Sequence, residues 1–547
     1  MENRERRKTK KGGMKGNTTV FALMISNIIM LIGRFLFDEM LGEIGMGYYA
    51  AIFELFIFIM VFTGWYLPQI EAKAVKGRLA KGQIKNAKRV LQGTLLFGIG
   101  FSLIISFFVI VLSEVMAKKL LLQPLNSLAL CVMAPAVVLS VVISAYRGYF
   151  EGMGTVVPTN ISRILEQVFA LVFGLIFGKS FYNYGEKIGN LVQNSNYAPA
   201  YAVVGIVTGI IAAQLLVLLF LGFLNRVFSR SLRKQMDKDN SKILDSYFEI
   251  IRNTLVSGLP YILTMIFVQG SVFIDMMLYM HYINGNTVQN YTVHYGSFYG
   301  KYCVIIGLLV CIMCFSFSKT LGAIRHFHKR EEYRIVKDIF SGEVHALAIY
   351  GIPIAVLLAA LAEPITKLFF GKAAGTVFLL QVSSSLVFLV PCALFFQYVL
   401  QLIGKQAIAL RNCAAAFTVQ IIAVIILLRG ANAGIAAVAY GYMFLFGVMT
   451  ILDGMTLLRY LKYSPQYIRM FGVPLLASAI CGILDMLLAK AMLEKAGATA
   501  TTIVCIIFGS IGYVVLLFAL NGINEKELSK IPGGTLIIKI GKVLHFL

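Results

Sequence analysis

The stretch RGYFEGMGTVVPTNISRILEQ, residues 147–167, separates two long apolar runs and decides how the chain on either side of it folds. Its glycines permit a tight turn and a close approach of helices. Pro158 suits the first turn of a helix, because its ring fixes the backbone and its missing N–H would have no helical partner there. The pattern therefore predicts a helical hairpin, with one apolar helix before the glycines and another starting near Pro158.

The composition places these helices in a membrane. Of 547 residues, 59% are hydrophobic and only 14% are charged, and the mean hydropathy is +0.80. Soluble chains carry about 25% charged residues, so the composition excludes a large soluble enzyme, a disordered chain and a disulfide scaffold. The cysteines all lie within apolar runs and are expected to pack as small apolar residues: Cys131, Cys303, Cys311, Cys314, Cys392, Cys413, Cys481 and Cys505.

Apolar runs of membrane-spanning length recur along the whole chain. A span needs about 20 apolar residues, and we expect an all-α integral membrane protein with about fourteen such helices. The predicted spans are 20–41, 48–67, 91–113, 124–145, 158–178, 200–225, 254–283, 299–320, 344–362, 376–402, 412–428, 434–458, 472–492 and 500–521.

The basic residues behind the net charge of +23 are distributed unevenly over the two sides of the predicted membrane topology. Of 49 Lys and Arg residues, 37 fall on the side that holds the N-terminus and 10 on the other. Because basic loops stay in the cytoplasm, both termini are predicted to be cytoplasmic, as a basic head at 1–19 and a basic tail at 522–547. The excess charge is therefore expected to meet anionic membrane lipids, not nucleic acid.

Several short patterns recur about 250 residues apart. Residues 149–154 resemble 399–404 in outline, Glu114 matches Glu363, and Asp38 matches Asp275. This spacing predicts two six-helix lobes, 20–226 and 254–458, joined by a cytoplasmic linker at 227–253 and followed by a terminal helix pair at 459–521. An even number of spans in each copy gives both lobes the same orientation in the membrane. Two such lobes around a central cavity are typical of a transporter.

Ionisable side chains within the spans are the candidate functional residues, because they are costly in lipid and usually face a cavity or a partner. Arg163 and Glu166 lie three residues apart on one helix face, so they either neutralise each other or offer an arginine to an anionic head group. Arg34 has Asp38 at i+4 and carries the same two interpretations, and it is also close enough to the outer end of its span to reach the interface. Asp275 lies deep in its span, and Lys301 opens the next one. We expect Asp38 and Asp275 to bind a coupled cation.

Motifs typical of metal, cofactor or enzyme sites lie in the wrong context. Cys311 and Cys314 lie inside an apolar span, and His326 and His328 lie in a basic loop with no acidic ligands. No nucleophile, base and acid arrangement of the kind used in covalent catalysis stands out. The sequence predicts no metal, no cofactor and no enzymatic activity.

The 147–167 stretch resembles the signature of the polysaccharide-exporter branch of the multidrug/oligosaccharidyl-lipid/polysaccharide exporter superfamily. It is most similar to the group of stage V sporulation protein B and Gram-positive lipid II flippases, whose pattern is RGYFQGM…PTAxSQxxEQ. The matching positions are Arg147, Gly148, Tyr149, Phe150, Gly152, Met153, Pro158, Thr159, Ser162, Glu166 and Gln167.

The resemblance implies fourteen helices and alternating access in the bacterial cytoplasmic membrane. It implies that the chain moves an undecaprenyl-pyrophosphate-linked saccharide, lipid II or another polysaccharide unit, from the inner to the outer leaflet. Arg34 and Arg147 would then meet the pyrophosphate. Asn27 and Ala170 stand where the family has basic residues, and Arg163 stands where it has glutamine, so Arg163 is expected to compensate. The candidate substrate-binding residues are Arg34, Arg147, Arg163, Glu166 and Lys301.

Two alternatives stay open at this point. A cation-coupled exporter of drugs or metabolites from the same superfamily would favour carboxylates over arginines in its cavity. A polytopic membrane scaffold would survive the joint loss of Arg34 and Arg147, which complementation by the double alanine variant tests.

Overall fold

The computed structural model describes residues 2–236, 239, 244–282, 288–370, 374–463, 465–520 and 522. These residues form helices and turns, and no strand is found among them. The predicted tail at 522–547 lies outside the described residues apart from residue 522, and part of the predicted linker at 227–253 also lies outside them. The all-helical prediction is confirmed over the described chain.

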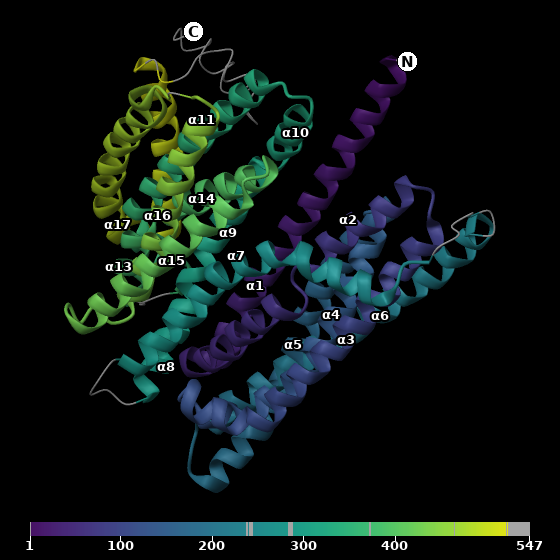
Figure 1. Cartoon of the computed structure of the whole chain (residues 1–547). Helices are drawn as coiled ribbons and strands as arrows, with labels where there is room; N and C mark the ends of the chain where they lie inside the picture. Colours follow the sequence, from purple (N-terminus) through teal and green to yellow (C-terminus); the bar gives the residue numbers. More distant parts are fainter. Residues whose placement is uncertain are drawn as a thin grey trace. The chain divides into compact units, whose positions relative to one another are not determined.

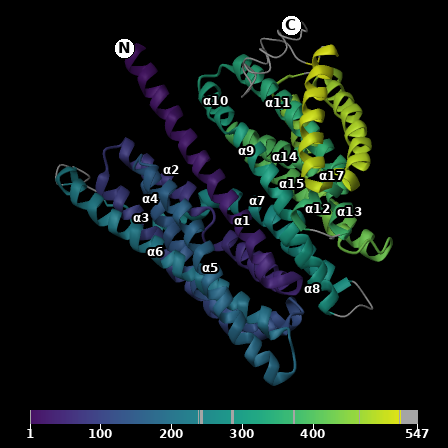
Figure 2. The ribbon, with the colours of Figure 1, turned by 180° about the vertical axis from the view of Figure 1, so that it is seen from behind.

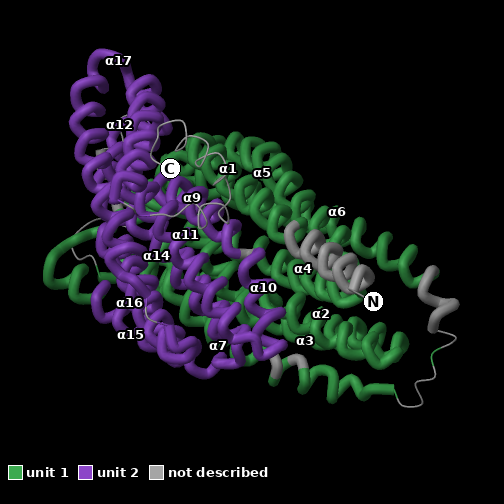
Figure 3. The backbone as a smooth tube through the Cα atoms, turned by 90° about the horizontal axis from the view of Figure 1, so that it is seen from above, with its two compact units in different colours: residues 1–300, 425–435 green, residues 301–424, 436–547 purple. Residues whose placement is uncertain are grey.

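Two compact units divide the chain (Figure 3). The first comprises residues 1–300 and 425–435, and the second comprises residues 301–424 and 436–547. The predicted lobes at 20–226 and 254–458 were defined from sequence repeats, not from contacts, and their boundaries stay a prediction.

The first unit holds eight labelled helices (Figure 1). They are α1 Glu2–Thr63, α2 Leu67–Ala80, α3 Ile84–Val115, α4 Ser127–Gly152, α5 Val157–Val192, α6 Tyr197–Met236, α7 Tyr247–Tyr282 and α8 Val288–Ser297. Helices α5 and α6 lie side by side in both views of the ribbon (Figures 1 and 2). Short π-helical or 3-10 turns follow α3 and α8, at Met116–Leu120, Pro124–Asn126 and Phe298–Tyr302.

The second unit continues with helices α9 to α17. They are α9 Cys303–Ser316, α10 Ser318–Lys329, α11 Tyr333–Ala360, α12 Ala362–Phe370, α13 Ala374–Ser383, α14 Leu386–Leu402, α15 Gln406–Arg429, α16 Ala436–Tyr460 and α17 Val473–Ala519, with a π-helical turn at Ile468–Gly472 before α17. The last turn and a half of α15 is grouped with the first unit.

Eleven helical segments among the described residues are long and apolar enough to cross a membrane, or twelve if the bent pair Val377–Ser383 and Leu386–Leu402 is one span. Two of the eleven, Thr18–Ala80 and Ile468–Ala519, each cover two of the predicted spans. Both contain a glycine with non-helical backbone, Gly42 at φ 66° and Gly497 at φ 76°, a conformation that L side chains rarely adopt. The multi-pass prediction is confirmed, and the count of fourteen stays a prediction.

Many large apolar side chains on these helices are exposed, as lipid-facing residues must be. Leu103, Ile104, Phe107 and Phe108 form such a face on α3, each more than half exposed. A soluble chain rarely leaves an apolar surface of this kind uncovered. The exposed faces therefore agree with the composition in placing the helices in a bilayer.

The predicted internal repeat recurs in the turns of the two units. In the turn after α4, the N–H groups of Met153, Gly154 and Thr155 donate to the carbonyls of 149, 151 and 150. The N–H groups of residues 403, 404 and 405 donate to the carbonyls of 399, 401 and 400, an offset of 250. Gly154 at φ 85° and Gly404 at φ 79° share the left-handed conformation. This agreement supports the repeat that the sequence predicts.

A second pair of turns repeats with an offset of 249. The turn between α2 and α3 has bonds from the N–H groups of 81, 82 and 83 to the carbonyls of 78, 79 and 78. The turn between α10 and α11 has the same bonds at 330, 331 and 332. Its left-handed residue is Glu331 at φ 61°, where the first unit has Gly82 at φ 73°. The α2–α3 and α10–α11 hairpins are thus structural counterparts.

Candidate functional site

The turn at 147–167 has the hairpin geometry that the sequence predicts. Helix α4 ends at Gly152 and α5 starts at Val157, with Pro158 in its first turn. The Thr159 hydroxyl of α5 donates to the carbonyl oxygen of Arg147 on α4 at 3.2 Å. This bond fixes the first turn of α5 against the last turns of α4, and it brings the polar side chains of the two helices together.

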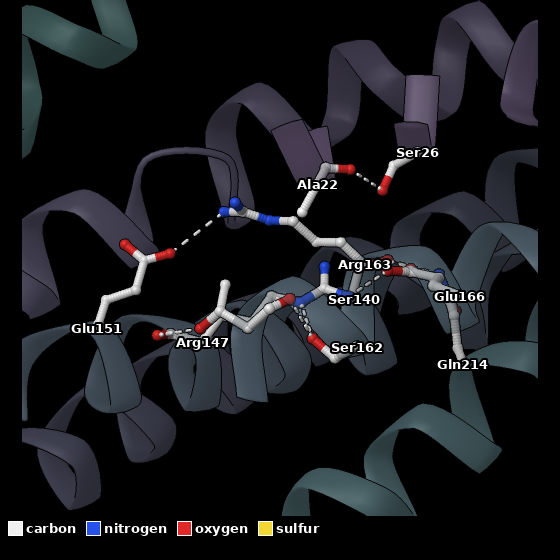
Figure 4. Close-up of polar contacts among 10 residues, drawn as sticks. Ala22, Ser26, Ser140, Arg147, Glu151, Ser162, Arg163, Glu166 and Gln214 are labelled. Atoms are coloured by element: carbon white, nitrogen blue, oxygen red, sulfur yellow. Dashed lines mark hydrogen bonds and ion pairs between the residues drawn. The ribbon is translucent and has the colours of Figure 1, made fainter. Parts of the chain in front are cut away.

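Arg147 is held by two residues of α5 (Figure 4). Its Nε donates to Ser162 Oγ at 2.9 Å, and its Nη2 pairs with Glu166 Oε2 at 2.6 Å. Ser162 and Glu166 lie four residues apart on one face of the helix, so they offer two acceptors to the planar guanidinium. The Arg147 and Glu166 side chains are only 12% and 17% exposed. A charge-assisted bond in such a place is among the stronger polar contacts in a protein.

Arg163 extends from α5 toward Glu151 on α4 (Figure 4). Its Nη2 lies 3.5 Å from Glu151 Oε1, and the two side chains are 18% and 20% exposed. Its other terminal nitrogen, Nη1, is buried and has no hydrogen-bond partner among the residues that the structure describes. Because a buried donor without an acceptor is costly, this nitrogen marks a place where an acceptor would be stabilised.

The ion pairs run between helices, and this differs from one interpretation of the sequence. Arg163 and Glu166 were expected to neutralise each other along α5, three residues apart. In the structure Glu166 pairs with Arg147, and Arg163 pairs with Glu151 instead. The reason is the hairpin itself, which brings α4 close enough to offer each of these residues a partner of opposite charge. The turn is consequently tied by two cross-helix pairs.

Arg34 lies in a second polar cluster of the same unit. It is 9% exposed, and its guanidinium carbon lies 4.2 Å from the ring centroid of Tyr299 and 5.2 Å from that of Phe53. The negative faces of aromatic rings attract a cation at such distances. Arg34 is thus buried against the two rings.

A carboxylate that the sequence did not assign to the site completes this cluster. Glu54 is 4% exposed and interacts electrostatically with Arg34. Gln269 on α7 donates from Nε2 to Glu54 Oε2 at 3.4 Å. Glu54 was recognisable in sequence as an ionisable residue within a span, whereas nothing in the sequence pattern connects Gln269 or Tyr299 with Arg34.

The other predicted site residues lie on α1, on α7 and in the π-helical turn after α8. Asp38 Oδ1 lies against the backbone of Gly300, where an added Cβ would come within 2.6 Å of it. Asp275 is fully buried within α7. Lys301 lies in the π-helical turn Phe298–Tyr302 and is the first residue of the second unit.

A cavity of about 810 Å³ within the first unit lies elsewhere again. Its lining residues are Tyr279, Tyr282, Tyr291, His294, Leu428, Arg429, Asn432, Ala433, Gly434 and Ile435. None of the predicted site residues is among them. The polar clusters around Arg34 and Arg147 are therefore packed against protein groups in this conformation, not spread along the wall of that cavity.

Comparison with known proteins identifies the family. Residues 16–299 match the sequence profile described as polysaccharide biosynthesis protein, and this range includes the α4–α5 turn, both polar clusters and Asp275. The chain belongs to the polysaccharide biosynthesis protein family.

The sequence of one curated relative matches part of this chain. The stage V sporulation protein B of Bacillus subtilis (strain 168) is 26% identical over 152 residues, which cover 28% of this chain. The matched region spans 29% of that protein's own length. This partial match agrees with the resemblance found in the 147–167 stretch.

Solved structures establish the fold. A structure of the lipid II flippase MurJ in an inward closed conformation has a TM-score of 0.63 and 14% identity, covering 91% of this chain and 98% of that one. An inward-facing multidrug resistance transporter of the MATE family and the MOP superfamily has a TM-score of 0.58 and 15% identity, covering 82% and 96%. This family member thus has the fold of MOP-superfamily transporters.

Proposed function

We propose that this chain is a flippase that carries a lipid-linked saccharide precursor of the cell envelope from the inner to the outer leaflet by alternating access. The passenger is an undecaprenyl-pyrophosphate-linked saccharide, either lipid II or another polysaccharide unit. The observation that carries the proposal is the arginine arrangement in the first unit. Arg163 has a buried nitrogen without an acceptor among the described residues. It lies in the same α4–α5 hairpin as Arg147, which matches the family's sequence pattern.

A pyrophosphate fits the chemistry of these side chains. Arginine presents a planar fork of donors that bonds phosphate oxygens in pairs, and it stays charged under all physiological conditions. The 3.5 Å separation between Arg163 and Glu151 is long for a charge-assisted bond, so Arg163 keeps donors that pyrophosphate oxygens can accept. Arg147, held by Glu166, is proposed to meet the head group together with Arg163, and Arg34 and Lys301 would complete the set of cations.

The driving force is proposed to be a coupled cation or the membrane potential. Asp275 is fully buried in α7 and Asp38 is half-buried in α1, so both are candidate ion-coupling residues. The protein is proposed to act in the bacterial cytoplasmic membrane with both termini in the cytoplasm, as the distribution of Lys and Arg indicates.

A cation-coupled exporter of drugs or metabolites is the second candidate. The likeness of the fold to a multidrug transporter and the buried Asp275 favour it. The two candidates differ in the charge of the passenger. A flippase for pyrophosphate lipids depends on the arginines, whereas an exporter of cationic compounds depends on the carboxylates.

A leaflet-accessibility assay tests the proposed function. The purified chain is reconstituted in vesicles that contain a fluorescent lipid-linked saccharide, and a membrane-impermeant reagent reports the fraction of the lipid in the outer leaflet. We expect the protein to accelerate the exchange between leaflets, with no acceleration for an uncharged polyprenyl lipid. Exchange no faster than in protein-free vesicles, with export of a cationic dye in the same vesicles, would favour the second candidate.

A further inference from the structure

The hairpins α2–α3 and α10–α11 differ at one buried pair of residues. The offset of 249 that relates their turns pairs Val75 with Ile324 and Leu91 with Phe340, and all four side chains are at most 4% exposed. The same offset pairs Glu71 with Thr320 and Thr94 with Glu343. The acid and the hydroxyl have therefore exchanged places: the acid is on the first helix of one hairpin and on the second helix of the other.

In the second unit this carboxylate has two hydroxyl partners. The Thr320 hydroxyl donates to Glu343 Oε2, and the Ser316 hydroxyl donates to Glu343 Oε1 at 3.4 Å. The Ser316 hydroxyl shares its one proton between Glu343 Oε1 and the Met313 carbonyl oxygen, which is 2.9 Å away. Donors beside the carboxylate are the condition for keeping a charge in a largely buried place.

In the first unit the carboxylate has no such donors. Glu71 is fully buried, and neither of its oxygens has a hydrogen-bond partner in the described part of the chain. Thr94 is 1% exposed, and its hydroxyl is likewise without a partner there. The counterpart of Ser316 is Leu67, so the second hydroxyl is missing from the sequence.

Packing places Glu71 and Thr94 in the same layer of the hairpin. Leu67 contacts the position of Gly98, and Val75 packs in one cluster with Leu91. Because the two helices run antiparallel, Glu71, one turn after Leu67, lies level with Thr94, one turn before Gly98. The side-chain oxygen atoms at these two positions are the two of the Glu71 carboxyl group and the one of the Thr94 hydroxyl.

Helix α4 covers Glu71 at Gly148 and Tyr149. A Cβ added at Gly148 would lie 2.9 Å from Glu71 Cβ and 2.8 Å from Pro68 Cα. Tyr149, the next residue, interacts electrostatically with Glu71. The α2–α4 contact is therefore so close that water is excluded from the carboxyl group while the helices stay packed.

The charged groups on the surrounding helices are engaged elsewhere or point to the surface. Arg147 on α4 pairs with Glu166, Arg78 on α2 with Asp245, and Arg89 on α3 stacks on Tyr247. The remaining charged groups near this end of the hairpin are exposed or half-buried: Lys73 and Lys76 on α2, Lys85 and Lys88 on α3, and Glu249 and Arg252 on α7. None of these charged groups neutralises Glu71, whose carboxyl group is surrounded by protein.

We propose that Glu71 is a proton-binding site, neutral while α2, α3 and α4 are packed as in this structure and charged when they separate. On separation the carboxyl O–H bond breaks and the proton passes to water as hydronium; on closure the carboxylate takes a proton back from hydronium and the O–H bond forms again. A metal ion fits less well, since hard cations take about six oxygen ligands and the neighbouring Leu67, Val75 and Leu91 are apolar. The inference does not depend on which molecule is transported.

Thermal unfolding of the full-length chain in detergent tests this site, comparing the wild type with Glu71→Gln from about pH 5 to about pH 8. Because the packed state holds the proton and the unfolded state releases it, raising the pH should destabilise the wild type but not the glutamine variant. We expect the two midpoints to agree near pH 5 and the variant to be several degrees higher near pH 8. The matched control Glu114→Gln, an exposed acid on α3, should follow the wild-type profile.

Two outcomes would overturn the proposal. One is a constant difference between Glu71→Gln and the wild type over the whole pH range. The other is a thermal midpoint of the wild type that rises with added sodium ions near pH 8, while the midpoint of Glu71→Gln does not change. That result would show a metal site. Should Glu71→Gln fail to fold, infrared spectroscopy tests the proposal instead. The carbonyl band of a protonated carboxyl group should be present in the wild type at neutral pH and should shift in Glu71→Asp. A band that is the same in both proteins would contradict the proposal.

Discussion

Replacing Arg147 with alanine is expected to reduce transport of the lipid-linked saccharide by about tenfold to a hundredfold, because a bond between charged partners contributes about 1.5–3 kcal/mol and each 1.4 kcal/mol is a factor of ten. The substitution removes the bonds to Ser162 Oγ and Glu166 Oε2 together. It also leaves the largely buried Glu166 without its cation, so we expect the thermal midpoint to fall as well. Leaflet accessibility and unfolding of the same preparation measure both effects.

A double-mutant cycle separates the structural effect from the functional one. Arg147→Ala and Glu166→Gln should couple by about 1–3 kcal/mol in stability, since the two residues are in direct contact. The double variant should therefore recover most of the stability that Arg147→Ala loses, but it should not recover transport. Arg147→Lys keeps the positive charge but lacks the planar fork of guanidinium donors, and we expect a transport rate between those of the wild type and Arg147→Ala. A double variant that regains full transport would show that Arg147 serves only to hold Glu166.

The second large effect is expected at Gly296, where α8 meets α1. A Cβ added there would lie 2.0 Å from the carbonyl oxygen of Glu43 and 2.6 Å from the backbone nitrogen of Gly47. Gly47 is equally restricted, because its own Cβ would lie 2.2 Å from the carbonyl oxygen of Thr292. Backbone atoms cannot rotate away as side chains do, so Gly296→Ala must separate the two helices.

We expect Gly296→Ala to destabilise the chain by about 3 kcal/mol or more, the upper part of the range for overpacking. The matched control is Gly100→Ala on α3, where a Cβ meets nothing within 4 Å and alanine favours the helix by up to about 1 kcal/mol. Midpoints of thermal unfolding in detergent compare the two variants. Equal midpoints for Gly296→Ala and Gly100→Ala would contradict the close α1–α8 contact.

The sequence predicts the helices well because each depends on local composition. Apolar length alone finds the spans, and the glycines and Pro158 of the 147–167 stretch define the turn between α4 and α5. The repeat was also visible in outline, and the hydrogen bonds at 149–155 and 399–405 support it. Where two spans are joined by a single glycine, as at Gly42, the boundary depends on one backbone dihedral angle that composition does not reveal.

Side-chain partners were harder to predict, because they depend on which helices lie next to each other. Spacing along α5 suggests that Arg163 bonds Glu166, but the hairpin offers each of them a partner on α4. The stacking of Arg34 on Tyr299 joins residues 265 positions apart, and nothing local indicates it. Glu71 stands in a stretch with several lysines and looks solvated in sequence; only the close approach of Gly148 shows that it is buried.

The central claim is that the arginines of the first unit bind an anionic head group, and native mass spectrometry of the chain with added lipid tests it most directly. The wild type, Arg34→Gln/Arg163→Gln and the surface control Lys118→Gln are each mixed with an undecaprenyl-pyrophosphate saccharide and with the neutral polyprenol. We predict that the wild type and the control retain the pyrophosphate lipid in preference to the polyprenol, and that the double variant loses this preference. Equal retention of the pyrophosphate lipid by the double variant and the wild type would contradict the claim.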